Sequence, residues 1–406
     1  MRIHSHIANS FIEQIDTASL IDHFLAFIQS KGGAAAVWRL PNDNKVQLLA
    51  DLSGGTSLED FDLLSLDQGF LLAPFLQSNE KAVHLHSEVL ISLQMESEGD
   101  APSLSKPVQV EMQEDLAESF EAFIDRAKKI KLKKGNGNKQ GTSKEAYIHA
   151  VKEGIKEIKA GKFLKIVPSK VKIISTDNPI SLGRSFLNAC KNYKNAFVNL
   201  SYTEDSGVWL GASPETLIEN TKEGQFKTVA LAGTQASSTK AISDIAWTQK
   251  EIEEQAYVSR YIIDCFKKIR LREYIEIGPK TIQAGNLFHL KTVFTVNTQE
   301  VNFPELASVM LKLLHPTSAV CGMPKAPSLE FLSNYEKHDR AYFSGYLGPV
   351  NIEQNTHLFV NLRCCQIFAE EIHFYAGAGI TEDSDPEKEW METEMKCKVL
   401  AAILAF

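Results

Sequence analysis

Three charged side chains near the carboxyl end of the sequence could together bind a divalent cation and an anion. Glu389, Glu392 and Lys396 follow one another at i, i+3 and i+7, a spacing that places them on one face of a helix. Carboxylates are preferred ligands of hard cations such as Mg²⁺, and an ammonium attracts anions. The same pattern also occurs on solvated helix surfaces. The neighbouring Trp390 and Met395 indicate that this helix packs against the protein.

Lys165 is a candidate general base. It lies in a stretch that alternates as a strand does, on one face with Phe163, Val167 and Val171. A lysine among apolar neighbours is desolvated, and desolvation favours the neutral amine that a base requires. The alternative is a lysine at the edge of a sheet, whose ammonium reaches water.

Two short motifs of small residues could hold a ligand. Glu215 follows Gly211-Ala212-Ser213-Pro214, so its carboxyl either belongs to a simple turn or is held beside a ligand. Thr234 follows Leu231-Ala232-Gly233, a run that is typical of a β-bulge or of a backbone that approaches a ligand closely. In the second case the Thr234 hydroxyl is a hydrogen-bond donor.

Arg363 and Glu254 add one charge of each sign. Arg363 shares a strand face with Phe359 and Asn361, and an arginine in that setting needs an anionic partner. A ligand carboxylate and a protein carboxylate both satisfy this need. Glu254 precedes Val258 by one turn of a predicted helix, a position that can point inward. Together, these residues form an inventory suited to a small polyanionic substrate held through Mg²⁺.

Long helices and hairpin strands must position these residues. The sequence predicts helices over residues 16–29 and 247–268, and a third that starts at the capping box of residues 142–145 and ends near Lys159. It predicts strands over residues 34–39, 46–49, 163–174 and 358–368, among others. Hairpins in place of strict βα alternation favour an α+β fold with antiparallel sheets. The basic, glycine-containing segment 126–139 separates an N-terminal α/β portion, 1–140, from the portion 141–406, which carries all the candidate residues.

Composition narrows the classes of function. The net charge is −8, whereas nucleic-acid-binding proteins typically have an excess of basic residues, so we do not expect a nucleic-acid partner. The six cysteines contain no CxxC pair, so we expect reduced thiols in a cytoplasmic protein. No apolar run approaches 18 residues and no signal-peptide core is present near the first residue, so we expect neither a membrane span nor export.

The chain resembles the chorismate-utilising enzymes, a family that includes isochorismate, salicylate, anthranilate and aminodeoxychorismate synthases. The resemblance covers about residues 145–406, and residues 1–140 match loosely. The motifs that carry it are Lys165–Lys170, Gly211–Glu215, Leu231–Thr234, Glu254–Gln255, His315–Gly322, Asp339–Gly345, Arg363, Ala376–Ile380 and Glu389–Lys396. Two positions depart from the family pattern: Lys170, where arginine is more frequent, and Pro168, where an aliphatic residue is usual.

The resemblance implies a fold and a reaction. The family fold is one large unit in which two antiparallel sheets pack face to face, helices cover the outside, and the active site lies in the cleft between the halves. A lysine at the position of Lys165 is similar to the water-using members, whereas the amine-using members lack it and take ammonia from a glutaminase subunit. The chain is therefore closest in pattern to isochorismate synthase, an isomerase, with salicylate synthase as the alternative and an ammonia-using subunit as a less favoured one.

The resemblance also implies a role for each candidate residue. Lys165 would activate a water that attacks C2 of chorismate, and Glu215 would protonate the departing C4 hydroxyl. Glu254 and Glu392 would bind Mg²⁺, which holds the ring carboxylate. The implied substrate-binding residues are Arg363, Gly377, Lys396, His289 and Thr234, and Glu389 would lie behind the two metal ligands. The expected partner is chorismate alone, bound by a monomer or weak dimer without a glutaminase, and the product could feed menaquinone or siderophore synthesis.

Overall fold

Two nine-stranded sheets form the centre of the molecule. The structure is a computed structural model that describes residues 15–76, 81–95, 106–124, 129–135, 141–236, 245–284 and 287–406. The first sheet has the order β7 (Lys106–Glu111), β6 (Val89–Gln94), β2 (Lys45–Asp51), β1 (Ala34–Arg39), β10 (Phe197–Thr203), β11 (Gly207–Ser213), β19 (Cys364–Ile367), β20 (Glu371–Gly377) and β9 (Ser169–Ser175).

The second sheet has the order β14 (Ile275–Ala284), β15 (Leu287–Asn297), β13 (Gln225–Ala236), β12 (Thr216–Asn220), β18 (Thr356–Val360), β17 (Tyr346–Val350), β4 (Gly69–Ala73), β5 (Ala82–His86) and β3 (Thr56–Leu58). A separate two-stranded ladder joins β8 (Lys165–Ile166) to β16 (Gly322–Met323).

The two sheets pack against each other through aromatic and aliphatic side chains. Phe197 of the first sheet stacks on Phe359 of the second with ring centroids 4.1 Å apart, and the rings of Trp38 and Phe70 pack at a tilt with centroids 5.3 Å apart. All four side chains belong to one buried cluster between the sheets. This layer confirms the predicted α+β architecture of two antiparallel sheets packed face to face.

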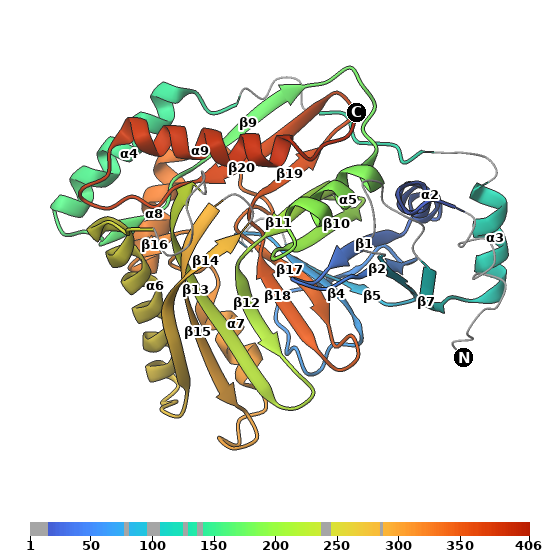
Figure 1. Cartoon of the computed structure of the whole chain (residues 1–406), viewed down its shortest axis with the longest axis horizontal. Helices are drawn as coiled ribbons and strands as arrows, with labels where there is room; N and C mark the ends of the chain where they lie inside the picture. Colours follow the sequence, from blue (N-terminus) through green and yellow to red (C-terminus); the bar gives the residue numbers. More distant parts are fainter. Residues whose placement is uncertain are drawn as a thin grey trace.

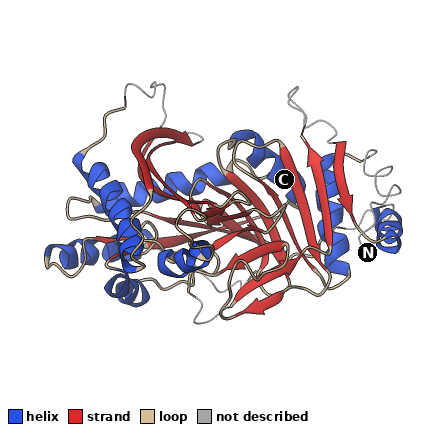
Figure 2. Cartoon of the chain, turned by 90° about the horizontal axis from the view of Figure 1, so that it is seen from below, coloured by secondary structure: helices blue, strands red, loops and turns tan. Residues whose placement is uncertain are grey.

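Helices cover the outer faces of both sheets (Figures 1 and 2). The first sheet packs with α2 (Thr17–Ser30), α3 (Glu114–Ile124), α5 (Leu182–Asn192) and α9 (Pro386–Ala401). The second packs with α4 (Lys144–Lys159), α6 (Gln249–Lys268), α7 (Leu306–Leu314) and α8 (Lys325–Tyr335). No helix in these described ranges is long and apolar enough to cross a membrane.

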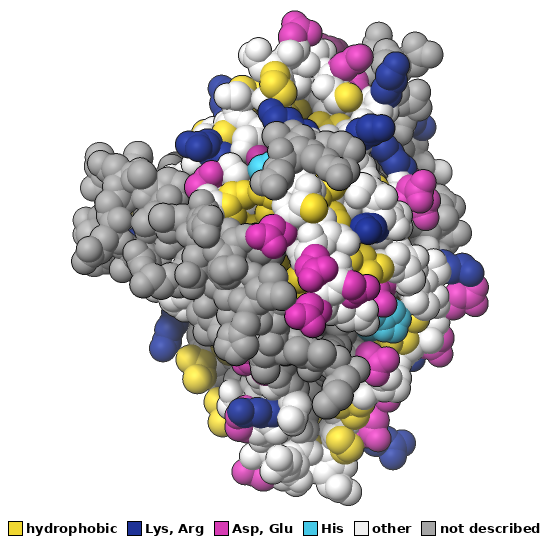
Figure 3. Space-filling view, turned by 90° about the vertical axis from the view of Figure 1, so that its right-hand side faces the viewer, with side chains coloured by type: hydrophobic (Ala, Val, Ile, Leu, Met, Phe, Trp, Pro, Cys, Tyr) yellow, Lys and Arg dark blue, Asp and Glu magenta, His cyan; other side chains and the backbone are white. Residues whose placement is uncertain are grey.

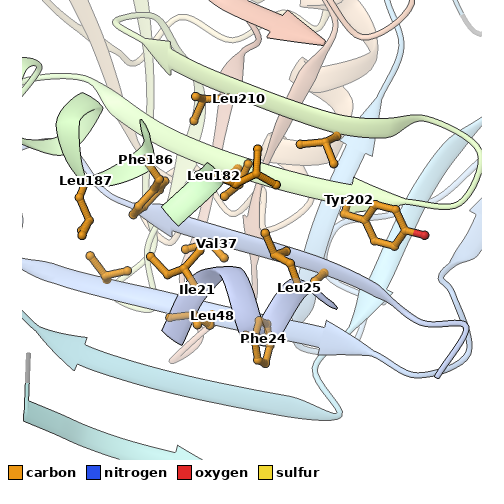
Figure 4. Packing of buried hydrophobic residues seen from close by; sticks show 14 of the residues in the cluster. Ile21, Phe24, Leu25, Val37, Leu48, Leu182, Phe186, Leu187, Tyr202 and Leu210 are labelled. Atoms are coloured by element: carbon orange, nitrogen blue, oxygen red, sulfur yellow. The ribbon is translucent and has the colours of Figure 1, made fainter. Parts of the chain in front are cut away.

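The helix α2 illustrates why these elements form. Asp16 caps its first turn by accepting a hydrogen bond from the Ser19 backbone N–H. Its apolar face, with Ile21, Phe24 and Leu25, packs on α5 and on strands of the first sheet (Figure 4). Each such side chain contributes roughly 1.5–3 kcal/mol when fully buried.

On the face that lies on the right in Figure 1, the coloured acidic and basic side chains are intermixed (Figure 3).

Strands from the first 140 residues enter both sheets. The strand β1 pairs with β10, and β4 pairs with β17. The portions 1–140 and 141–406 therefore share each sheet.

The three predicted helices are present in the structure. Those predicted near residues 16–29 and 247–268 are α2 and α6, and the one predicted after residue 142 is α4. The capping residue of α4 is Ser143.

Two predicted strands are interrupted, and both interruptions matter for the site. The stretch 163–174 divides into β8 and β9 at Val167 and Pro168, because proline lacks the N–H that would continue a ladder. The stretch 358–368 divides into β18 of the second sheet and β19 of the first. Arg363 lies at this crossing with a φ of 48°, a left-handed conformation that ends a strand. The prediction that Arg363 lies mid-strand was therefore wrong.

Candidate active site

A charged pocket lies where the chain crosses between the sheets. Helices α6 and α9 contribute Glu254, Glu392 and Lys396 to its lining. The lining includes all of the predicted residues except Glu389 and Thr234, namely Lys165, Glu215, Glu254, His289, Arg363, Gly377, Glu392 and Lys396. The structure thus brings together side chains that are up to 231 positions apart, from Lys165 to Lys396.

Lys165 is fully buried, at 0% exposure, so it does not extend to water from a sheet edge. Its Nζ lies 2.8 Å from Oε1 of Glu254, an ion pair between β8 and α6. The strand β8 is held on one side by β16 and on the other by reciprocal backbone hydrogen bonds between Ile166 and Ile380. A Cβ at Gly379 would collide with Oε1 of Glu254 and lie 2.9 Å from Cε of Lys165. The absence of a side chain at Gly379 therefore makes room for this ion pair.

Glu215 lies at the other crossing between the sheets, in the two-residue connection from β11 to β12. Its backbone carbonyl accepts a hydrogen bond of 3.0 Å from the Val360 N–H. Its side chain is 4% exposed. Burial raises the pKa of Glu215 to about 8, although the nearby Lys165 acts in the opposite direction. The carboxyl is thus largely protonated at neutral pH, the form that a general acid requires.

His289 and Arg363 form a hydrogen-bonded pair on one wall of the pocket. Nδ1 of His289 donates to the Gly233 carbonyl at 2.8 Å. Nε2 of His289 accepts from Nη2 of Arg363 at 2.7 Å. A carbonyl can only accept and a guanidinium can only donate, so this network fixes the neutral tautomer with hydrogen on Nδ1. Burial, together with the charge of Arg363, lowers the pKa of His289 to about 3.

The neutral His289 orients the guanidinium of Arg363 without cancelling its charge. Burial lowers the pKa of Arg363 to about 10, which still leaves the group charged at neutral pH. Thr234 directly follows Gly233, where the register of β13 against β15 shifts, as the predicted bulge requires. The side chain of Thr234 lies outside the described part of the structure.

Three ion pairs between carboxylates and lysines lie at the pocket, and one of their six residues, Glu389, does not line it. Besides the pair of Lys165 with Glu254, Lys396 Nζ lies 2.8 Å from Glu392 Oε1 and donates to the Gly377 carbonyl at 2.8 Å. The third pair joins Lys250 to Glu389, whose side chain is almost fully buried. Glu389 itself does not line the pocket.

The electrostatics of the carboxylates follow from these partners. Burial acts to raise the pKa of Glu254, but Lys165, Lys250 and Lys396 outweigh burial and hold that pKa below its usual value. Burial and the neighbouring Glu392 raise the pKa of Glu389, with Lys250 opposing them. Burial acts to lower the pKa of Lys250, yet Glu389, Glu254 and Glu392 raise it overall.

The oxygen donors are suited to a hard divalent cation. Glu254 on α6 and Glu392 on α9 both line the pocket, and anionic carboxylates are the ligands that Mg²⁺ prefers. Within the described ranges, no three His, Cys, Asp or Glu side chains are already gathered as a metal-binding group. The donor chemistry fits Mg²⁺, but each carboxylate is paired with an ammonium that a metal ion would have to displace.

Lys250 is one of the charged pocket residues that the sequence did not assign to the site, as are Glu251 and Arg340. It precedes Glu254 by four residues in α6, so both side chains lie on one face of the helix. This spacing of four residues could have predicted that Lys250 lies beside Glu254. The prediction considered only the acidic residues of this helix, one of which, Glu251, forms the capping box with Thr248.

Comparison with known proteins identifies the family. The family model described as "Chorismate binding enzyme" matches residues 69–405. The chain belongs to this family, and the resemblance seen in the motifs is confirmed.

Several curated relatives of the chain are isochorismate synthases. The isochorismate synthase EntC of Escherichia coli (strain K12) is 30% identical over 203 residues, 48% of this chain and 51% of that protein. The chain thus spans about half the length of that relative. The vibriobactin-specific isochorismate synthase of Vibrio cholerae is 27% identical over 246 residues, 59% of this chain and 61% of that protein.

Solved structures support the fold over nearly the whole chain. MenF, the menaquinone-specific isochorismate synthase of Escherichia coli, superposes with a TM-score of 0.71 at 18% identity and covers 96% of this chain and 91% of its own. Anthranilate synthase component I of Streptococcus pneumoniae gives a TM-score of 0.63 at 18% identity and covers 85% of this chain and 82% of its own. The fold is therefore shared by members with different names.

Proposed function

We propose that the protein is an isochorismate synthase, an isomerase that converts chorismate to isochorismate. The observation that carries the proposal is the pairing of Lys165 with a protonated Glu215 in one pocket. Lys165 supplies an amino group, which is ion-paired in this structure, and Glu215 supplies a carboxylic acid with a pKa of about 8. An amine and a protonated carboxyl in one pocket suit the addition of water at one ring carbon and the loss of hydroxide at another.

The proposed reaction conserves atoms and charge. Lys165 takes a proton from water as the water oxygen bonds to C2 of the ring. The ring double bonds shift, the C4–O bond breaks, and Glu215 gives its proton to the departing hydroxyl, which leaves as water. Lys165 is ion-paired with Glu254 in this structure, and an ion pair stabilises the ammonium. Acting as a base therefore requires Lys165 to leave that pair.

The remaining pocket residues bind the substrate. Chorismate carries two carboxylates, one on the ring and one on the enolpyruvyl group. Arg363, oriented by His289, would bind the enolpyruvyl carboxylate, together with the Gly377 backbone and Lys396. Glu254 and Glu392, with Glu389 behind them, would hold Mg²⁺, and a bound Mg²⁺ would supply positive charge to the ring carboxylate.

Lys165 supports water over ammonia as the nucleophile, so the proposal includes no glutaminase subunit. The names of the relatives agree with this choice. All six cysteines are buried free thiols, which supports the expected cytoplasmic location.

Product analysis tests the proposal. The purified protein is incubated with chorismate and Mg²⁺, and the products are separated by liquid chromatography. We expect isochorismate without pyruvate. Salicylate with equimolar pyruvate would assign salicylate synthase instead, and product formed only with ammonia would assign an amine-transferring enzyme. If none of these appears, the proposed activity is wrong.

A further inference from the structure

The ammonium of Lys250 lies among the carboxylates that the proposed function assigns to Mg²⁺. Its Nζ pairs with Oε1 of Glu389, and Glu254 and Glu392 also attract it. The residue lies in the first turn of α6. A cation there opposes the helix dipole, so its placement depends on the surrounding carboxylates.

Three carboxylates at the pocket are each paired with an ammonium without any ligand. Glu254, Glu389 and Glu392 face Lys165, Lys250 and Lys396, one ammonium for each carboxylate. Three buried or half-buried carboxylates without cations would repel one another strongly. The three lysines therefore stabilise the metal-free protein.

The three lysines differ in how freely they can move. Lys165 is fully buried, and Lys396 is also tied to the Gly377 carbonyl. The side chains of Lys250 and Lys396 are similarly exposed, at 26% and 22%, but the one hydrogen bond of Lys250 among the described residues goes to Glu389. Its four-carbon stem allows the ammonium to reach solvent. Lys250 is thus the cation that can leave at the smallest cost.

We propose that Lys250 is an internal counter-cation that competes with the divalent metal: it neutralises the carboxylates in the metal-free protein and withdraws when Mg²⁺ binds. Lys250 is therefore a positioning residue that sets the affinity for the metal. The proposal rests on the metal site of the proposed function.

The test compares Lys250→Met, which keeps the stem and removes the charge, with Lys250→Arg, which keeps the charge. Mg²⁺ affinity is measured by isothermal titration calorimetry without chorismate, and melting temperature is measured with and without Mg²⁺. We expect Lys250→Met to bind Mg²⁺ roughly five- to tenfold more tightly, the size expected for losing a partly solvated competing charge. Its melting temperature should fall without Mg²⁺ and recover with it. Lys250→Arg should stay within about twofold of the wild type.

A purely structural lysine gives a different result. Lys250→Met would then melt lower by the same amount with and without Mg²⁺, and its Mg²⁺ affinity would be unchanged or weaker, which overturns the proposal. If Lys250→Met does not fold, Lys250→Gln replaces it under the same criteria.

Glu254→Gln separates this failure from failure of the proposed function. When the wild type binds Mg²⁺ and Glu254→Gln binds it more weakly, the metal site stands, and only the Lys250 variants decide the inference. When the wild type binds no Mg²⁺, or Glu254→Gln binds it equally well, the metal site is wrong and the inference is overturned with it.

Discussion

Glu215 and Arg363 lie on two neighbouring crossings between the sheets and are fastened to each other's strands. The Val360 N–H at the end of β18 donates to the Glu215 carbonyl, and the Ala212 N–H in β11 donates to the Arg363 carbonyl, both at 3.0 Å. The proposed acid and the proposed carboxylate-binding residue are therefore held in a fixed relation by backbone hydrogen bonds.

Replacing Lys165 should abolish most turnover. Lys165→Ala removes the proposed base, and we expect kcat to fall by about 10²–10⁴, the range for a single general base. The fold should persist, because Lys250 and Lys396 also neutralise Glu254. Steady-state kinetics and circular dichroism measure the two effects. Lys172→Ala, in a lysine that pairs with Glu394 outside the pocket, is the control. Activity of Lys165→Ala within tenfold of the wild type would contradict the assigned role.

Replacing Glu215 should separate binding from chemistry. Glu215→Gln preserves size but cannot protonate a leaving hydroxyl, so the Kd for chorismate should change little while kcat collapses. In the wild type, kcat should decline above about pH 8 as the acid loses its proton. Equilibrium binding and a pH–rate profile provide the measurements. A loss of binding as steep as the loss of turnover would make Glu215 a ligand of the substrate.

The same carboxyl should make stability depend on pH. Its pKa is about 8 when folded, against an ordinary value of 4.5. Between these values the folded state keeps a proton that the unfolded state has released, so wild-type stability should fall as pH rises from about 4.5 to 8. Glu215→Gln has no such titrating group, so its free energy of unfolding relative to the wild type should increase with pH, by up to a few kcal/mol at pH 8. Urea unfolding at pH 5 and pH 8 checks this, and a constant difference between the two proteins would refute it.

Neutral amides at the two pocket carboxylates should weaken metal binding. Glu254→Gln and Glu392→Gln replace a charged ligand with a poor one for a hard cation, so each should need more Mg²⁺ for half-maximal activity. Activity should recover partly at high Mg²⁺. Mg²⁺ titrations of activity and calorimetry measure the change. An unaltered Mg²⁺ dependence would remove that residue from the metal site.

A methyl group at residue 379 should disrupt the site without the replacement of any charged residue. The Cβ of Gly379→Ala would displace the carboxylate of Glu254 and crowd Lys165, so activity should fall by at least about tenfold. The control is Gly161→Ala, where φ is +76° and no atom lies within 4 Å of the new Cβ. That variant should lose about 1–2 kcal/mol of stability but keep its activity. Equal activities of the two variants would show that the space beside Glu254 is unimportant.

Sequence alone predicted the residue types of the site better than their surroundings. The spacing of Glu389, Glu392 and Lys396 located one face of α9 correctly, because helical periodicity is a local property. Whether Lys165 is buried depends on β16 and on Ile380, which are far away in sequence. No local pattern could have provided that information.

The crossings were missed for a related reason. Residues 358–368 have the composition of one strand, and the change of sheet at Arg363 is imposed by tertiary pairing with β11 and β12. Lys250, in contrast, could have been found from its spacing to Glu254.

The crossings at Glu215 and Arg363 also determine whether the site can unfold locally. Each joins strands from the middle of both sheets, so neither can open as a loop while the sheets stay paired. The amides of Ala212 and Val360 should consequently exchange with deuterium only through global unfolding. Heat should therefore inactivate the protein at the temperature at which its tertiary structure melts, without an earlier, partly opened inactive form.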